Sequence, residues 1–395
     1  MTRTPAEWIA LARELAARFA ERAPRHDREG SFPFENFEDL RTAGFLALTV
    51  PRRYGGFELP LPDYLRVLEE LAAGDASTAL GLAMHLVRFG AEREAPTIPE
   101  RWFAELCRGA VEHGWLVNTA ATEEGLGSPA GGGVPETRAA ATEGGWVLNG
   151  RKTFTTLAPA LRAAIVSARL ALADPGPPVI GNFLVFLDEP GVRVVETWDS
   201  LGMRATGSHD LILEDVFLPH DRLLNQRAAG TPDPRGDAAF VWFALGIAAV
   251  TIGVARAARD YAVAFARERV PLGQRPIREM PGVRARIARI DLLIHRARTL
   301  VADAAHAWHL RTPDPPPAVD RAAMAKIETL NAAIEAVDLA MRVVGGVSLL
   351  RNRPLERHYR DVRAGLHNPP LEDRALEQLA RRALDEAPFP TGAVE

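Results

Sequence analysis

The segment RDVRAGLHNPP at residues 360–370 places a histidine, His367, at the end of a charged stretch with helical spacing. An imidazole with a pKa near about 6.5 accepts a proton at neutral pH and donates one when it is protonated. The Asn-Pro-Pro that follows would end a helix by itself, because proline lacks a backbone N–H and restricts the residue before it. Two roles therefore stay open for His367, proton transfer at a site or a structural cap.

A second histidine, His85, lies in the apolar stretch LGLAMHL, where a buried helix histidine is the simpler interpretation. The carboxylates Glu372 and Asp373 follow the prolines closely and are further candidate bases. None of the ten histidines shows the HExxH spacing of a zinc site. The single cysteine, Cys107, excludes an internal disulfide and predicts a packed thiol in a reducing compartment.

The composition is that of an ordinary globular protein, with 47% hydrophobic residues, 25% charged residues and a net charge of -4. A nucleic-acid partner or an anionic membrane surface is therefore not expected. The N-terminal residues mix apolar and charged types at helical spacing, unlike a signal peptide. No uninterrupted run reaches the roughly 18 apolar residues of a membrane span. We expect a cytoplasmic protein with no membrane span.

The chain has 395 residues, too many for one hydrophobic core, which stops growing near roughly 250 to 300 residues. Apolar residues recur every three or four positions in residues 1–114, which predicts an N-terminal helical domain. Residues 115–228 hold β-rich runs such as AAIVSARLAL and HDLILEDVFL, and predict a central β domain. Long helical patterns return in residues 229–395, where an apolar seam from Ala323 to Val344 indicates a core or a subunit interface.

Six segments of the sequence, in this order, resemble the acyl-CoA dehydrogenase superfamily. They are FLALTVPRRYGGFELPLPDYLRVLEELAAGDASTALGLAMHL (45–86), TEEGLGS (122–128), WVLNGRKTFTT (146–156), LGMRATGSHDLILEDVFLP (201–219), RERVPLGQ (267–274) and VVGGVSLLRNRPLERHYRD (343–361). The resemblance covers about residues 8–385. It implies an α+β protein with the acyl-CoA dehydrogenase fold, that is, an N-terminal helical domain, a central β-barrel-like domain and a C-terminal four-helix bundle.

The resemblance further implies a homotetramer or homodimer that binds a flavin. FAD is the expected cofactor and FMN the alternative, because Met280 and Arg342 stand where the family has two glutamines. Thr122 would face the flavin pyrimidine edge and Thr156 would bond flavin N5, although both also fit ordinary strand threonines. The implied cofactor-binding residues are Thr122, Ser128, Phe154, Thr156, Arg269, Gly345 and Gly346.

Four of these candidates have a more specific implied role. Arg269 would hold the flavin pyrophosphate from a neighbouring subunit, and the two glycines would allow close backbone approach near the adenosine end. Ser128 would line the thioester pocket, or be a plain turn serine. Arg204, in LGMRATGS, is expected to pin a loop of the β domain against its neighbours.

In dehydrogenases of the family, a glutamate eight residues after the Asp of an Arg-Asp pair removes the α-proton of an acyl thioester while hydride leaves for flavin N5. Eight residues after Asp361 lies Pro369. The position that some relatives use instead falls near Trp242 and Phe243. The catalytic glutamate of the family is therefore not found.

Three functions remain open. The first expectation is oxidation of an acyl thioester, on CoA or a carrier protein, at Cα–Cβ, with His367, Glu372 or Asp373 as base and an electron-transfer protein as partner. The alternative is a monooxygenase, because LHNPP resembles the Leu-His-Asp-Pro of the flavin-dependent monooxygenase branch, which takes reduced flavin from a partner reductase. His367, with His85, would then supply a proton in a dry pocket. A flavin- or acyl-carrier-binding scaffold without catalysis is the third.

Overall fold

The chain divides into two compact units, Met1–Phe243 and Ala244–Glu395. The computed structural model describes residues 3–125, 133–171, 176–231, 236–273 and 275–385. The first unit holds helices and all eight strands, the described part of the second unit is helical, and each unit is described by itself. Both the expected helical domain (1–114) and the expected β domain (115–228) fall inside the first unit.

Helices occupy the first 112 residues of the first unit. They are α1 (Pro5–Glu29), α2 (Phe34–Ala43), α3 (Leu61–Gly74), α4 (Ala76–Glu94) and α5 (Glu100–Glu112). Local signals set their ends: Thr4 and Glu7 form a capping box at the start of α1, and Gly30 ends it in the left-handed conformation. Asp75 accepts hydrogen bonds from the backbone of Ser77 and Thr78 at the start of α4.

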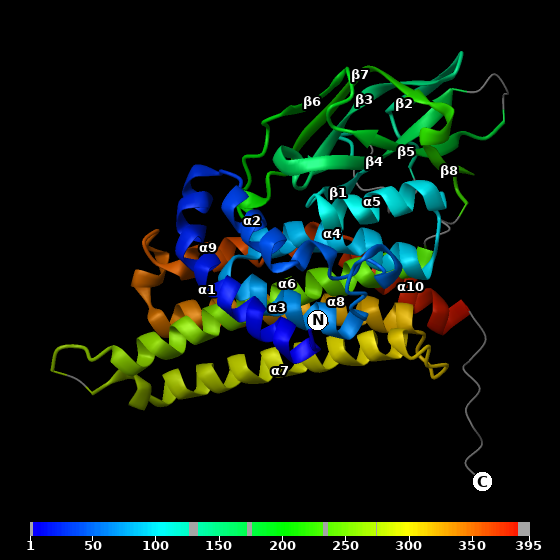
Figure 1. Ribbon diagram of the computed structural model, residues 1–395. Coiled ribbons are helices and arrows are strands. Elements are labelled where there is room, and N and C mark those ends of the chain that lie inside the picture. Colours follow the sequence, from blue (N-terminus) through cyan, green and yellow to red (C-terminus); the bar gives the residue numbers. More distant parts are fainter. Residues whose placement is uncertain (1–2, 126–132, 172–175, 232–235, 274, 386–395) are drawn as a thin grey trace, which may run out of the picture. The chain divides into compact units, whose positions relative to one another are not determined.

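The rest of the first unit is mainly an eight-stranded sheet (Figure 1). Its strands are β1 (Leu116–Ala120), β2 (Arg138–Thr142), β3 (Gly145–Thr155), β4 (Leu161–Ala171), β5 (Val179–Phe186), β6 (Val192–Val195), β7 (His209–Pro219) and β8 (Leu223–Ala228). The order is β6-β7-β3-β2-β4-β5-β8, with β1 paired to β4. Both β1 and β2 run parallel to β4, whereas β4 pairs antiparallel with β5.

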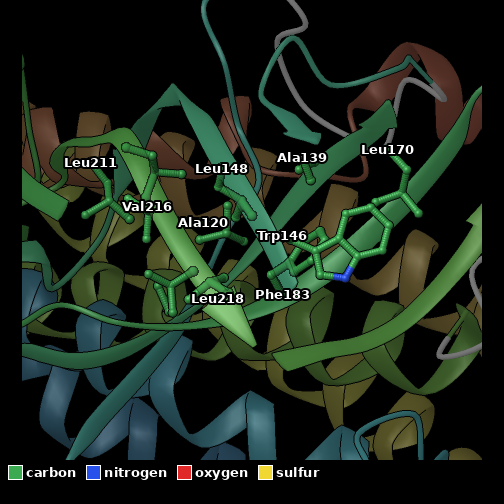
Figure 2. Close-up of a cluster of buried hydrophobic side chains, with 14 residues drawn as sticks. Ala120, Ala139, Trp146, Leu148, Leu170, Phe183, Leu211, Val216 and Leu218 are labelled. Carbon is green, nitrogen blue, oxygen red and sulfur yellow. The ribbon is translucent and has the colours of Figure 1, made fainter. Parts of the chain in front are cut away.

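Strand β4 is buried on both faces, which explains its nearly continuous apolar sequence. Ala164, Val166, Ala168 and Leu170 belong to a cluster with Trp146 and Phe183 (Figure 2). The alternate residues Ala163 and Ile165 belong to a second cluster with residues of α5. Cys107 is buried in that second cluster, where burial raises the pKa of its thiol, so the expected packed thiol is confirmed.

The second unit is helical. Helix α6 (Gly236–Glu268) crosses the boundary between the units, and α7 (Pro281–His309), α8 (Ala318–Val344), α9 (Pro354–Asp361) and α10 (Glu372–Asp385) follow (Figure 1). Arg289, Arg296 and Asp303 of α7 form ion pairs with Glu335, Glu328 and Arg321 of α8, in that order. The residue numbers rise by seven along α7 and fall by seven along α8, so the two helices are antiparallel.

The apolar seam predicted on α8 faces a core. Ala323, Ile327, Leu330, Val337 and Val344 are all buried. Of the two interpretations that the pattern left open, burial within this chain is therefore the one the structure gives for these positions.

Helix α6 is also long and apolar enough to cross a membrane by length and composition, with a mean hydropathy of 2.2 over an 18-residue window. The sequence analysis, which counted uninterrupted apolar runs, did not identify this helix as long and apolar enough to span a membrane. The share of the window buried inside the protein is 83%, as in the core helix of many globular proteins.

Candidate functional site

Two turns lie side by side at the end of β3 in the first unit. The backbone N–H of Leu157 donates to the carbonyl of Thr206 at 3.0 Å, and that of Ala158 donates to Gly207 at 3.1 Å. Arg204 lies two residues before Thr206, and its Nε donates to the carbonyl of Asp27 in α1 at 2.8 Å. This bond confirms that Arg204 pins the loop of the β domain that carries Thr206. The turn that carries Thr156 is therefore held by backbone bonds rather than by side-chain packing alone.

A chain of three hydroxyls joins these turns. Thr156 Oγ1 lies 2.9 Å from Ser208 Oγ, and Ser208 Oγ lies 2.7 Å from Thr206 Oγ1. Thr206 donates onward to the carbonyl of Met203 at 2.9 Å. Sequence reasoning selected Thr156 and missed Ser208 and Thr206, although the motif LGMRATGS contains both.

Phe154, two residues before Thr156, has an unusual exposure and backbone conformation. Its side chain is 63% exposed, and its backbone has the left-handed φ of 53° that a bulky residue rarely adopts. It lies between Lys152 and Thr155, where the register of β3 against β7 shifts. The ring meets Trp198 edge to face, with centroids 5.3 Å apart. An exposed aromatic surface next to Thr156 suits a flat, apolar ligand.

Thr122 reaches the same strand. Its carbonyl accepts a hydrogen bond from the backbone N–H of Thr153 at 2.9 Å. The next residue, Glu123, is buried and accepts hydrogen bonds from Lys152 Nζ and Thr137 Oγ1, each at 2.5 Å. Burial alone would raise the pKa of Glu123, but Lys152 and Thr137 hold it below its usual value. This ionised pair fixes the TEE turn to β3. Ser128 lies outside the described residues.

His85 is fully buried in α4 and uses both ring nitrogens on the backbone. Nε2 lies 2.9 Å from the carbonyl of Leu46, and Nδ1 accepts the N–H of Val117 at 3.0 Å. Burial lowers the pKa of His85 to about 4, so the ring is neutral. The structure thus places His85 in its simpler interpretation, a buried helix histidine that ties β1 to the helices. The next residue along β1, Asn118, donates to the carbonyl of Thr156 at 3.0 Å.

In the second unit, His367 ends a short 3-10 helix (Ala364–His367) and is exposed. The next segment, Asn368 to Pro370, is bound by Lys326 of α8, a residue that the sequence analysis did not select. Lys326 Nζ donates to the carbonyl of Asn368 at 2.8 Å and to that of Pro370 at 2.9 Å. Burial lowers the pKa of Lys326 to about 8, against the attraction of Glu372.

The other candidates of the second unit lie at helix ends. Arg269 is exposed just beyond α6, with its backbone bonded to Phe265 and Ile277. Gly345 follows α8 with φ 77° and ψ -158°, a conformation essentially restricted to glycine. A Cβ added at Gly345 or Gly346 would meet no atom of the described chain within 4 Å, so open space adjoins both.

The resemblance would place the family's base at Pro369 or near Trp242 and Phe243, and none of these side chains is a proton acceptor. Pro369 lies in the segment held by Lys326, and Trp242 is fully buried, with its ring 5.3 Å from that of Tyr64 and its Nε1 donating to Glu94. Of the carboxylates beyond the prolines, Glu372 accepts a hydrogen bond from Asn331 at 3.2 Å at the start of α10. Asp373, the next residue, is exposed.

The structure brings Thr122, Phe154 and Thr156 together in the first unit, whereas Arg269, Gly345, Gly346 and His367 belong to the second. The first group fits a flavin on two observations. Phe154 offers an exposed ring, and the buried Thr155 Oγ1 has no hydrogen-bond partner among the described residues. An orphaned polar atom beside an exposed aromatic ring is the pattern of a ligand site, since buried polar groups are almost always paired.

The comparisons with known proteins agree with this arrangement. Residues 6–110, 118–216 and 245–368 match the N-terminal, middle and C-terminal domains of acyl-CoA dehydrogenase. The putative acyl-CoA dehydrogenase YdbM of Bacillus subtilis is 41% identical over 96% of this chain and 97% of its own length.

Two further relatives are not named as acyl-CoA dehydrogenases. L-evernosamine nitrososynthase of a Micromonospora species is 33% identical over 90% of this chain and 85% of its own. The structure of KijD3 with FMN and a dTDP-linked amino sugar is 29% identical, with a TM-score of 0.83 over 97% of this chain and 94% of that one. On its domain matches and these identities, the chain belongs to the acyl-CoA dehydrogenase family of flavin-dependent oxidoreductases.

Proposed function

We propose that this chain is a flavin-dependent oxygenase within its family, which takes reduced flavin from a separate reductase and oxidises a small molecule with O₂. One oxygen atom goes to the substrate and the other leaves as water, so the two electrons of the reduced flavin and two protons balance the reaction. Reduced flavin supplies those electrons and the position at which oxygen reacts.

The observation that carries the proposal is the absence of a carboxylate from both positions where the family removes an α-proton. Pro369 has no side-chain acceptor, and the Trp242 indole is packed in the core with its N–H already donated. An oxygenase has no α-proton to remove, so the lack of a carboxylate at these two positions does not impair its reaction. A thioester dehydrogenase would lose its proton acceptor.

His367 is the candidate proton-transfer group. The imidazole is exposed at the end of its 3-10 helix, and the following backbone is fixed by two hydrogen bonds from Lys326. A histidine can hold a proton and deliver it near neutral pH. His367 would thus keep the oxygen reaction coupled to the substrate, with Lys326 as a positioning residue.

The relatives support this choice. A nitroso group carries oxygen on nitrogen, and a nitrososynthase is 33% identical to this chain. The FMN in the KijD3 structure supports FMN beside the expected FAD as the flavin. A reductase as partner and a homotetramer or homodimer remain predictions of the resemblance.

The proposal is tested with purified protein, reduced FMN or FAD prepared without oxygen, and a panel of amines, thioethers and thioesters. Addition of O₂ should give an oxygenated product from at least one compound. His367→Ala should still bind reduced flavin and consume O₂, but release hydrogen peroxide in place of product. His113→Ala, which changes an exposed histidine of the first unit, is the matched control. Unchanged coupling in His367→Ala would remove the assigned role.

Thioester oxidation remains the second candidate, because the 41% identical relative is named a putative acyl-CoA dehydrogenase. Here Glu372, Asp373 or His367 would have to act as base. Anaerobic mixing of the oxidised holoprotein with acyl-CoA thioesters separates the two functions. Bleaching of the flavin absorbance by any thioester would contradict the oxygenase proposal and make the search for a relocated base worthwhile.

A further inference from the structure

His209 is a buried histidine at the start of β7, directly opposite Thr155 of β3. Its Nδ1 accepts two backbone N–H groups, that of Thr197 at 3.0 Å and that of Trp198 at 3.1 Å. A ring nitrogen that accepts a hydrogen bond carries no proton. These two bonds therefore require a neutral imidazole with its proton on Nε2.

Trp198 links this histidine to Phe154. The backbone N–H of Trp198 is bound by His209, and its indole Nε1 donates to the carbonyl of Met203 at 3.1 Å. The indole ring meets the Phe154 ring at an angle of 73° between the two planes. Among the described residues, Trp198 carries the aromatic ring that Phe154 contacts. Because the Phe154 side chain is mostly exposed, its orientation depends strongly on this one neighbour.

The charges around His209 decide when this arrangement holds. Burial lowers the pKa of His209, whereas the carboxylates of Glu196 and Asp210 attract a proton to it. Arg151 of β3 offsets part of that attraction, because its Nε donates to Asp210 Oδ2 at 2.7 Å. The ring is therefore neutral at pH 7 and gains a proton only in acid, where both backbone N–H groups lose their acceptor.

We propose that His209 is a positioning residue of the flavin site, which fixes the backbone of Trp198 so that Trp198 fixes the Phe154 ring beside which the flavin lies. Flavin as the ligand is the one point that this inference takes from the proposed function. A flat ligand binds more tightly to a ring that is already held in one orientation, because less conformational freedom is lost on binding.

The experiment measures the dissociation constants of FMN and FAD by fluorescence titration for the wild-type chain and variants of His209. Leucine has no acceptor, so His209→Leu should bind flavin about five- to tenfold more weakly. The amide oxygen of asparagine can take the place of Nδ1, so His209→Asn should keep nearly the wild-type affinity. In a Trp198→Ala background, His209→Leu should cause no further loss, since the histidine acts through Trp198. His220→Asn, at an exposed histidine just beyond the other end of β7, is the matched control.

A second readout follows Trp198 itself in the protein without flavin. Labelling with 5-fluorotryptophan gives fluorine signals from the seven tryptophans, and the signal missing from Trp198→Phe belongs to Trp198. Between about pH 7.5 and 5 this signal should shift in the wild-type chain as His209 gains a proton. It should stay constant in His209→Asn, whose amide does not titrate.

Three results would each overturn the inference. They are wild-type flavin affinity in His209→Leu, an undiminished loss from His209→Leu in the Trp198→Ala background, and equal pH profiles of the Trp198 signal in the wild-type chain and His209→Asn. Bleaching of the wild-type holoprotein by a thioester would instead contradict the proposed oxygenase function and leave the role of His209 in place.

Discussion

The ammonium group of Lys326 lies 2.8 Å from the carbonyl oxygen of Asn368, the residue that follows His367. A second bond, to Pro370 at 2.9 Å, spans the prolines that prevent this segment from continuing as a helix. Proline supplies no N–H, so the segment depends on an outside donor to hold its carbonyls. One buried side chain of α8 thereby sets the path of the backbone beside the candidate proton-transfer group.

Replacing Lys326 by methionine should keep the packing of its stem and remove the donor. Two partly buried carbonyls would lose their partner, so the free energy of unfolding should fall by about 2 to 4 kcal/mol. Denaturant titration measures the loss, and the pH dependence of peroxide release reports whether His367 has moved. Arg298→Met, at an exposed position of α7, should change neither. An unaltered pH profile in Lys326→Met would show that the lysine does not position His367.

The pair of Lys152 and Glu123 should behave as a coupled unit. Both side chains are almost fully buried, so Lys152→Met or Glu123→Gln alone should lower the free energy of unfolding by about 3 to 5 kcal/mol, since each leaves an unpaired group. The double variant should cost less than the sum of the two single changes. A double-mutant cycle by chemical denaturation measures the coupling, and strict additivity would contradict the pairing.

His85 should make the protein sensitive to acid. Its pKa in the folded chain is lowered by burial to about 4, below the value of about 6.5 in the unfolded chain. The unfolded state therefore binds the proton first, and stability is kept above about pH 6.5 and lost as the pH falls toward 4, by roughly 3 kcal/mol in total.

His85→Gln tests this acid sensitivity. The variant should be less stable at neutral pH, but its stability should fall less steeply than that of the wild type between about pH 6.5 and 4. His113→Gln changes an exposed histidine and serves as the control. Equal slopes for His85→Gln and the wild-type chain would mean that His85 does not titrate as described.

Phe154 should show a trade between stability and binding. Its left-handed backbone costs roughly 1 kcal/mol for any residue but glycine, so Phe154→Gly should stabilise the fold by about that amount and weaken flavin binding. Phe154→Ala removes the ring and keeps the strained backbone. It should weaken flavin binding equally without the gain in stability. Unfolding midpoints and flavin fluorescence titrations measure both, and undiminished affinity in Phe154→Ala would exclude the ring from the site.

Much of the fold could be predicted from the sequence, because its signals are local. The run AAIVSARLAL became β4, and the apolar seam expected from Ala323 to Val344 lies on α8 (Ala318–Val344). Strand β1 was not predicted, because LVNTA is short and partly polar. It forms a strand by pairing with β4, which the local sequence does not reveal. Helix α10 was missed as well, since its single buried apolar residue, Ala375, gives almost no pattern.

The site was less accessible to prediction. Thr156 and Phe154 were found through a motif, but Ser208 lies 52 residues further along the chain and meets Thr156 only because two turns share backbone bonds. The partners of Lys326 are backbone carbonyls, which carry no residue type to recognise. His85 was offered as a catalytic partner, yet its role depends on which groups face its two ring nitrogens.

Both lysines of the sequence are buried, with 0% of Lys152 and 1% of Lys326 exposed. All positive side chains on the outside are then arginines or histidines. A guanidinium keeps its proton to above about pH 12, so alkaline titration leaves the outer cations unchanged while it removes the proton from an inner amine. For the same reason, acylating reagents should modify these two lysine side chains only after the protein opens, so the rate of labelling at Lys152 and Lys326, measured residue by residue, reports the rate of unfolding.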